Sequence, residues 1–183
     1  MQALNLALFQ VLGAGHDPQP QLLWFAAAVA KNSSWLCVAL MGWAVWRHPS
    51  QRAYVVAALV AAAAASVLAH ELADAFGMPR PFTMGLSPAH IEHGARGSMP
   101  SAHASVMFTV ALVFLLRAPL RALGWGLLLI AALTGWARVY VGVHFPFDIV
   151  AGLLLAIAIA AVLWALLRLR GRHRAPARSV SRD

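Results

Sequence analysis

Five long apolar segments, separated by short polar stretches, dominate this sequence of 183 residues. Hydrophobic residues make up 61% of the chain and charged residues 11%, with a mean hydropathy of +0.72. A bilayer core takes about 20 apolar residues per helix, and backbone groups within lipid must be hydrogen-bonded inside the protein. We therefore predict an all-α, polytopic membrane helix bundle with about five spanning helices. The expected spans are residues 22–46, 54–73, 102–116, 123–140 and 147–169.

A further apolar stretch, from Ala3 to Leu12, precedes the first span. It is too short to cross a bilayer, so we expect an interfacial or re-entrant N-terminal helix. No Lys or Arg occurs before Lys31 and no small-residue cleavage site is evident, which argues against a removable signal peptide. We expect one membrane-embedded domain over residues 1–170 and a basic tail over residues 171–183.

Basic residues mark one end of the predicted bundle. Arg47 and Arg52 connect the first two spans, and Arg117 and Arg121 connect the third and fourth. With five spans, the arginine-rich C-terminal tail falls on the same side, and the positive-inside rule makes that side cytoplasmic. The net charge is +8, and we expect the basic residues that produce it to face anionic lipids. We expect no nucleic acid as a partner.

Polar residues able to handle a phosphoryl group fall at the other ends of these segments. Ser101 is placed to cap a helix, and His103 lies in its first turn, where free N–H groups favour an anion. Arginine binds two phosphate oxygens through its rigid donor fork. Together these residues predict a phosphoryl-transfer site on one face of the bundle. Its expected members are Arg80, Ser101, His103, Arg138, His144 and Asp148.

His144 and Asp148 are four residues apart, which puts them on one face of a helical turn. The carboxylate could then accept from one imidazole nitrogen and present the other as a nucleophile. Taken singly, each fragment has a simpler explanation: a helix cap at Ser101, an interfacial His-Asp contact, or a membrane-anchoring arginine at Arg80. The joint pattern favours the phosphoryl-transfer site.

The longest loop, residues 77–100, is rich in Gly, Pro and His, and a loop of this length in a small bundle is typically functional. His90 and His93 lie within it, but they lack a carboxylate or thiolate complement, so we expect no metal site. The residues near this loop to which the sequence assigns no role are Glu71, Glu92, His93 and Arg96.

In order and spacing, these segments resemble the three signature motifs of the type 2 phosphatidic acid phosphatase superfamily. Those motifs are Lys, six residues, Arg-Pro; then Pro-Ser-Gly-His; then Ser-Arg, five residues, His, three residues, Asp. The resemblance covers residues 73–148. The matching residues are Arg80-Pro81, Pro100-Ser101-Ala102-His103, Arg138, His144 and Asp148.

The resemblance implies a role for each of these residues. His144 would attack phosphorus to give a phosphohistidine, Asp148 would orient it, and His103 would protonate the leaving group. The phosphate oxygens would be held by Arg80, Arg138 and the Ser101 region. The resemblance also implies that the reaction needs no metal ion and no other cofactor.

Three positions depart from the family pattern. Its lysine is Ala73 here, its second-motif glycine is Ala102, and the serine before Arg138 is Ala137. Lys31, in the first span, is a candidate to replace the missing cation, because an ionisable residue at membrane depth is a functional candidate. The alternative is that Lys31 snorkels or pairs with an acidic residue, Glu71 or Asp74.

The first motif without its lysine, the His-containing loop and the ending Gly-Val-His-Phe-Pro-Phe-Asp resemble the undecaprenyl-diphosphate phosphatases of the bacitracin-resistance type. That narrower resemblance implies hydrolysis of undecaprenyl diphosphate to the monophosphate and inorganic phosphate. The active site would face the periplasmic side of a bacterial inner membrane. The expected partners are the polyprenyl lipid phosphate and membrane lipids, with no obligate protein partner.

Other functions remain open at this stage. The same chemistry could act on phosphatidylglycerophosphate, phosphatidate or a lipid A phosphate, or could transfer the phosphoryl group to a lipid acceptor. A transporter or structural membrane protein is the alternative of another class. It would predict a polar stripe through several spans, whereas the polar residues here gather at one depth.

Overall fold

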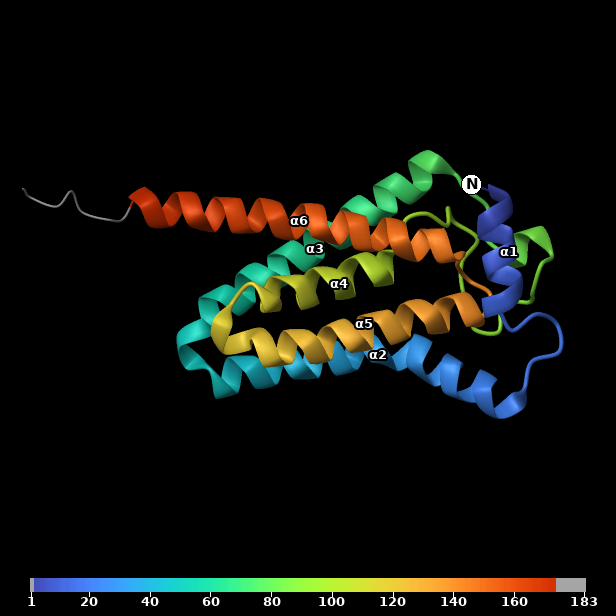
Figure 1. Ribbon diagram of the computed structural model, residues 1–183, viewed down its shortest axis with the longest axis horizontal. Coiled ribbons are helices and arrows are strands. Elements are labelled where there is room, and N and C mark those ends of the chain that lie inside the picture. The colour runs from blue at the N-terminus through green and yellow to red at the C-terminus, as the bar shows by residue number, and fades with distance from the viewer. Residues whose placement is uncertain (1, 174–183) are drawn as a thin grey trace, which may run out of the picture.

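The computed structural model describes residues 2–173, and the regular structure within this range is helical (Figure 1). This confirms the predicted all-α membrane fold. Residues 174–183, most of the predicted basic tail, lie outside the described part of the chain. The α-helices are α1 (Gln2–Leu12), α2 (Pro20–Arg47), α3 (Arg52–Phe76), α4 (Ala102–Leu115), α5 (Arg121–Tyr140) and α6 (Pro146–His173). Three short 3-10 helices are η1 (Pro49–Gln51), η2 (Phe82–Met84) and η3 (Ala118–Leu120).

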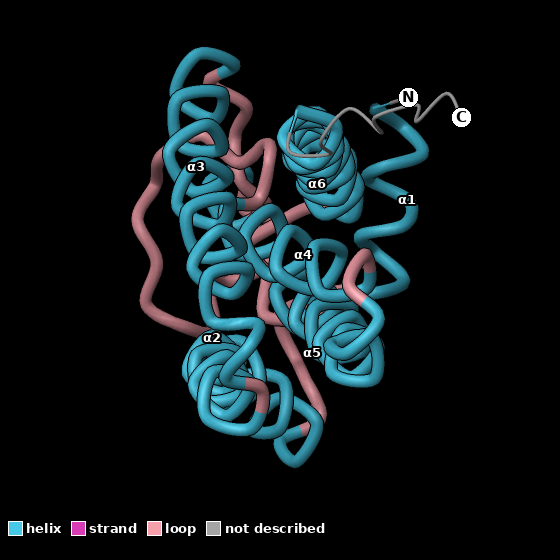
Figure 2. Tube along the Cα trace, turned by 90° about the vertical axis from the view of Figure 1, so that its left-hand side faces the viewer, coloured by secondary structure: helices cyan, strands magenta, loops and turns pink. Residues whose placement is uncertain are grey.

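Helix α4 is the centre of the bundle. It packs against α3, α5 and α6, and Figure 2 shows it enclosed by them. Its sequence is apolar on all sides, as expected for a helix without a solvent-facing or lipid-facing side. Its buried residues include Met107, Val110 and Phe114.

Four helical segments of the described chain are long and apolar enough to cross a membrane. They are Pro20–Arg47, Pro49–Phe76, Ala118–Tyr140 and Pro146–Arg170. Helix α4 occupies the position of the expected third span but has only 14 residues. At about 1.5 Å per residue it measures roughly 21 Å, less than the bilayer core. Its short length leaves room for a loop to enter the bundle before it begins.

The outward faces of the long helices are apolar. Trp35 on α2, Leu129 on α5 and Leu154 on α6 have relative exposures of 74%, 71% and 61%. Large apolar side chains in such numbers on every side of a bundle require a lipid environment. The chain is therefore an integral membrane protein.

Basic residues gather at one end of the bundle, where α2 meets α3 and α4 meets α5. There Arg117 Nε donates to Gln51 Oε1 at 2.8 Å, and the Arg117 guanidinium lies over the Tyr54 ring. The Tyr54 hydroxyl donates to the Val113 carbonyl at 2.7 Å, which ties α3 to α4. We call this the basic end.

The opposite end, which we call the loop end, carries α1, residues 77–101 and residues 141–145. Figure 1 shows α1 lying across this end of the bundle. Asn5 Oδ1 accepts from the Phe147 N–H at 3.0 Å, and the Phe9 ring packs edge-on against Phe145 at 5.3 Å. The predicted short N-terminal helix is therefore present and packs against the start of α6.

Candidate active site

The Arg80 side chain is buried at the loop end and held by backbone carbonyls. Its Nε donates to Arg96 O at 2.8 Å, its Nη2 to Gly97 O at 2.8 Å and its Nη1 to Val143 O at 2.9 Å. Only 6% of the residue is exposed. The guanidinium thus joins the long loop to the loop that precedes α6, and its position is fixed before any anion binds.

His144 and Asp148 meet as the spacing predicted. His144 Nδ1 lies 3.2 Å from Asp148 Oδ2, and both side chains are buried. His144 Nε2 lies 3.2 Å from Arg80 Nη1. Because a guanidinium can only donate, Nε2 must hold the lone pair and Nδ1 the proton. The imidazole is therefore in the tautomer that a nucleophile at Nε2 requires.

Asp148 is held by more than its histidine. Its Oδ2 also accepts from the Phe145 N–H at 2.7 Å and from the Ser98 hydroxyl. The Asp148 carbonyl accepts from the Ser101 N–H at 3.0 Å, which ties the start of α6 to the start of α4. Ser98 was not among the residues predicted from the sequence. Its only signal was its place two residues before Pro100, in a loop already expected to be functional.

Burial controls the protonation of His144. Loss of solvent lowers the pKa of its imidazole from 6.5 to about 4, and the charges of Arg138 and Arg80 act in the same direction. The hydrogen bond and the charge of Asp148 raise this pKa but do not outweigh burial. At neutral pH His144 is uncharged and able to act as a nucleophile.

Ser101 caps α4, as expected: its hydroxyl accepts from the Ala104 N–H at 3.5 Å. Ser101 is fully buried and does not line the cavity described below, whereas Ala102 and His103 do. The structure thus places the Ser101 hydroxyl in the helix cap and brings His103, on the first turn, to the site.

Arg138 lies beneath the site, on the last turn of α5. It is 2% exposed, and its Nη1 donates to the Ala30 carbonyl of α2 at 3.4 Å. Among the described residues, Arg138 Nε has no hydrogen-bond partner. A buried guanidinium with a free donor, close enough to influence the pKa of His144, is suited to an anion.

A cavity of about 180 Å³ brings three of the predicted residues together, whereas Arg138 and Asp148 do not line it. His103 and His144 both line it, as does Arg80. Ala73, at the position of the family lysine, forms part of its wall. The other lining residues are Ala69, His70, Asp74, His93, Gly94, Arg96, Gly97, Pro100 and Ala102.

Lys31 does not belong to this cavity. Lys31 is exposed on α2 and is absent from the cavity wall. Within residues 2–173 no ion pair joins it to Glu71 or Asp74. In this structure no lysine takes the place of the cation lost at Ala73. No three His, Cys, Asp or Glu side chains in this range are arranged to hold a metal ion.

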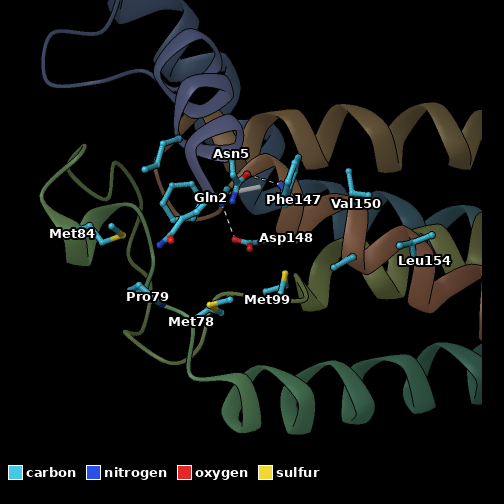
Figure 3. Close-up of a pocket in the computed structure, with 13 residues that line it drawn as sticks. Gln2, Asn5, Met78, Pro79, Met84, Met99, Phe147, Asp148, Val150 and Leu154 are labelled. Carbon is cyan, nitrogen blue, oxygen red and sulfur yellow. Dashed lines mark hydrogen bonds between the residues drawn. The ribbon is translucent and has the colours of Figure 1, made fainter.

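A second, larger cavity is lined by Asp148, the partner of His144. It has a volume of about 670 Å³ and is bounded by α1, by the start of α6 and by the loop after α3 (Figure 3). Its lining is mainly apolar. The labelled residues include Met78, Met84, Met99, Val150 and Leu154. An apolar space beside the site is suited to a hydrocarbon chain.

Comparison with known proteins agrees with this geometry. The model of the PAP2 superfamily matches residues 54–172, which include Arg80, His103, Arg138, His144 and Asp148. A candidate undecaprenyl-diphosphatase, YbjG of Escherichia coli strain K12, is 33% identical over 84% of this chain and 78% of its own length. The undecaprenyl-diphosphatase BcrC of Bacillus subtilis strain 168 is 32% identical over 66% of this chain and 63% of its own length.

Two solved structures have the same fold. LpxE of Aquifex aeolicus superposes with a TM-score of 0.70 and 26% identity, covering 88% of this chain and 95% of that protein. A PAP2-type phosphatidylglycerolphosphate phosphatase of Bacillus subtilis superposes with a TM-score of 0.68 and 20% identity. That match covers 92% of this chain and 86% of the Bacillus subtilis protein. The latter likeness concerns the fold alone.

Proposed function

Because the chain belongs to the PAP2 superfamily, and is thus a membrane lipid phosphatase, we propose that its substrate is undecaprenyl diphosphate. The reaction would release inorganic phosphate and leave undecaprenyl monophosphate. The relatives named undecaprenyl-diphosphatase, at 32 to 33% identity, support this substrate. The observation that carries the chemistry is the His144 Nε2 lone pair, which faces Arg80 while Nδ1 is bonded to Asp148.

In the proposed first step, His144 Nε2 attacks the terminal phosphorus. An N–P bond forms and the P–O bond to the lipid-side phosphate breaks. His103, protonated when the anionic substrate is bound, donates its proton to the departing oxygen. Asp148 stabilises the charge that develops on the imidazole. Arg80 and Arg138 bind the phosphoryl oxygens, whose charge is spread over them in the transition state.

In the second step, water attacks the phosphohistidine. His103, now neutral, takes a proton from that water, the N–P bond breaks, and inorganic phosphate leaves. His144 regains its lone pair and His103 its proton. The chain's own residues thus supply nucleophile, acid, base and positive charge.

The larger apolar cavity supports a lipid with a long hydrocarbon chain. Its wall contains Phe145 and Asp148, neighbours of the reacting histidine, and extends along α6 to Leu154. In this proposal the prenyl chain lies between α1 and α6 while its headgroup is held at the loop end. The phosphatidylglycerophosphate, phosphatidate and lipid A phosphate alternatives share this chemistry and differ in the chain and its linkage.

We also propose that the loop end faces the periplasm and that the C-terminus is cytoplasmic. The basic end supports this orientation through the positive-inside rule. The sole cysteine, Cys37, is buried, so single cysteines can be added as probes. A membrane-impermeant maleimide should label Glu92→Cys in intact cells and should label Ser50→Cys only after lysis. The reverse pattern would refute this orientation.

The decisive experiment is a substrate panel with the purified protein. Undecaprenyl diphosphate should be the best substrate by kcat/KM, against phosphatidylglycerophosphate, phosphatidate and lipid A 1-phosphate. A substrate labelled at the terminal phosphate should leave an acid-labile, alkali-stable label on the protein. His144→Ala should abolish both turnover and label, whereas His16→Ala, at an exposed position before α2, should retain both.

Each possible failure points to a different error. Faster hydrolysis of another lipid would refute the substrate but leave the chemistry intact. Turnover that survives His144→Ala would refute the nucleophile. Appearance of the label on a lipid acceptor instead of free phosphate would make the protein a phosphotransferase.

A further inference from the structure

His93 lines the cavity but belongs to none of the three motifs. Its ring centroid lies 5.8 Å from that of His144, with the two rings nearly perpendicular at 82°. It is half-buried and lies in the loop before α4, outside the helices. The proposed mechanism gives His93 no role, although its ring lies beside that of the nucleophile.

The hydrogen bonds of His93 leave one nitrogen for a ligand. His93 Nδ1 lies 2.9 Å from the Gly94 carbonyl, which can only accept, so Nδ1 carries a proton. Nε2 forms no hydrogen bond within the described residues. Burial lowers the pKa of His93 below 6.5, so without a ligand Nε2 holds the lone pair. The negative charge of a bound diphosphate acts in the opposite direction and favours protonation of Nε2, which then donates a charged hydrogen bond to a phosphate oxygen.

Arg96 brings a permanently charged side chain to the same loop. Its side chain is exposed and lines the cavity, while its backbone carbonyl accepts from Arg80 Nε at 2.8 Å. The bond to Arg80 fixes the position of the Arg96 backbone relative to His144. His93 and Arg96 therefore form an outer pair of basic side chains, beyond the inner group of Arg80 and Arg138.

The two phosphoryl groups of a diphosphate must be bound by different residues. The group that is transferred must lie against His144 and the inner arginines. The group that stays on the lipid carries its own negative charge. Residues that bind the transferred group cannot bind this second group at the same time. A monophosphate has no such second group. Cations outside the reacting centre thus favour a diphosphate over a monophosphate.

We propose that His93 and Arg96 bind the phosphoryl group that remains on the lipid, and so select lipid diphosphates over lipid monophosphates. This inference rests on the proposed function and deepens it. Asp74, at the cavity wall, places a carboxylate on the facing helix α3.

Packing is the alternative explanation for His93, since its ring could serve only to support His144. His93→Phe separates the two, because it keeps an aromatic edge against His144 and removes both nitrogens. Arg96→Gln removes the charge and leaves the backbone acceptor of Arg80 in place. Matched controls are His16→Phe and Arg47→Gln, both at exposed positions far from the cavity wall.

Turnover is measured on undecaprenyl diphosphate and on undecaprenyl monophosphate, which differ only in the second phosphoryl group. The ratio of their kcat/KM values should fall about 10- to 100-fold in His93→Phe and in Arg96→Gln, as expected for loss of a charged hydrogen bond. Most of the fall should come from the diphosphate. An equal fall on both substrates, or an unchanged ratio, would overturn the inference.

Binding gives a second measurement that does not depend on the lipid. Calorimetry compares methylenediphosphonate, which has a second phosphoryl group, with methylphosphonate, which has one. The preference for the diphosphonate should fall about 10-fold or more in both variants and persist in both controls. A preference that is absent from the wild type or unchanged in the variants would overturn the inference. Failure to hydrolyse undecaprenyl diphosphate, with this preference intact, would refute the proposed function alone.

Discussion

Arg80 Nη1 lies 3.2 Å from His144 Nε2, so the lone pair that would attack phosphorus is occupied by a donor. The same Nη1 also donates to the Val143 carbonyl at 2.9 Å. A phosphate arriving between the two side chains would take over the donor from His144 and release the lone pair. The arginine that binds the substrate would thereby also free the nucleophile.

Arg80→Lys should lower kcat by about 10²- to 10³-fold, because lysine keeps the charge but loses the fork of donors. It would also lose contacts with the Arg96 and Gly97 carbonyls, so the melting temperature is measured beside phosphate release. Arg47→Lys, at the exposed end of α2, is the control. Near-normal kcat in Arg80→Lys would show that charge alone suffices.

Asp148→Asn should lower kcat about 10³-fold or more while the protein remains folded. The amide can donate to His144 Nδ1 and so favour the wrong tautomer, and it cannot stabilise a charged imidazole. The initial burst of phosphoenzyme in rapid-quench experiments should disappear. A full burst with slow release of phosphate would instead assign Asp148 to the second step.

Ser98→Ala should lower kcat by about 10-fold with little change in KM, since it removes one of three hydrogen bonds to Asp148 Oδ2. The carboxylate would keep the Phe145 N–H and the imidazole. Ser50→Ala, at the basic end, should behave as the wild type. A change in KM alone would mean that Ser98 contacts substrate instead of positioning the carboxylate.

The imidazole of His144 should stay neutral well below the ordinary pKa of histidine. Burial lowers its pKa from 6.5 to about 4, so the uncharged nucleophilic form persists as the pH falls and is lost only near pH 4. Nitrogen-15 spectra of labelled protein in micelles, with His144→Ala for assignment, measure this directly. Free histidine in the same buffer is the reference. Protonation of His144 near pH 6.5 would contradict the assignment.

Gly97→Ala should reduce both stability and activity. A Cβ at this position would lie 1.8 Å from the Ala73 carbonyl oxygen, so the loop must move, and with it the Gly97 carbonyl that holds Arg80. Activity should fall at least about 10-fold. Gly126→Ala on α5 is the matched control, because its Cβ would meet nothing within 4 Å. Equal effects in both would show that the loss does not come from the clash with the Ala73 carbonyl.

Residues of the candidate site could be picked out from the sequence because they lie at or near helix ends. The His144–Asp148 spacing of four residues required only a local turn, and Ser101 and His103 required only the start of a helix. Because long apolar helices end on the same side of the membrane, few other arrangements of these residues are possible. The helical fold and the proximity of Arg80, His103 and His144 could therefore be predicted from the sequence.

Other features depended on the rotation and length of individual helices. Lys31 lies in a segment that is apolar all around, so periodicity could not tell its exposed side from the buried one. The Ser98 contact depends on the path of a loop of irregular backbone. Nor does hydropathy show that α4 would be shorter than its neighbours, because its apolar run continues to Leu116.

The shortness of α4 has a consequence for how a lipid would be handled. With the central helix starting below the ends of its neighbours, the reacting atoms lie recessed within the protein. A headgroup can descend to meet them while its chain stays in the leaflet, so the enzyme would avoid the cost of lifting a hydrocarbon chain into water. Both the lipid that enters and the lipid that departs would then remain dissolved in the bilayer throughout the cycle.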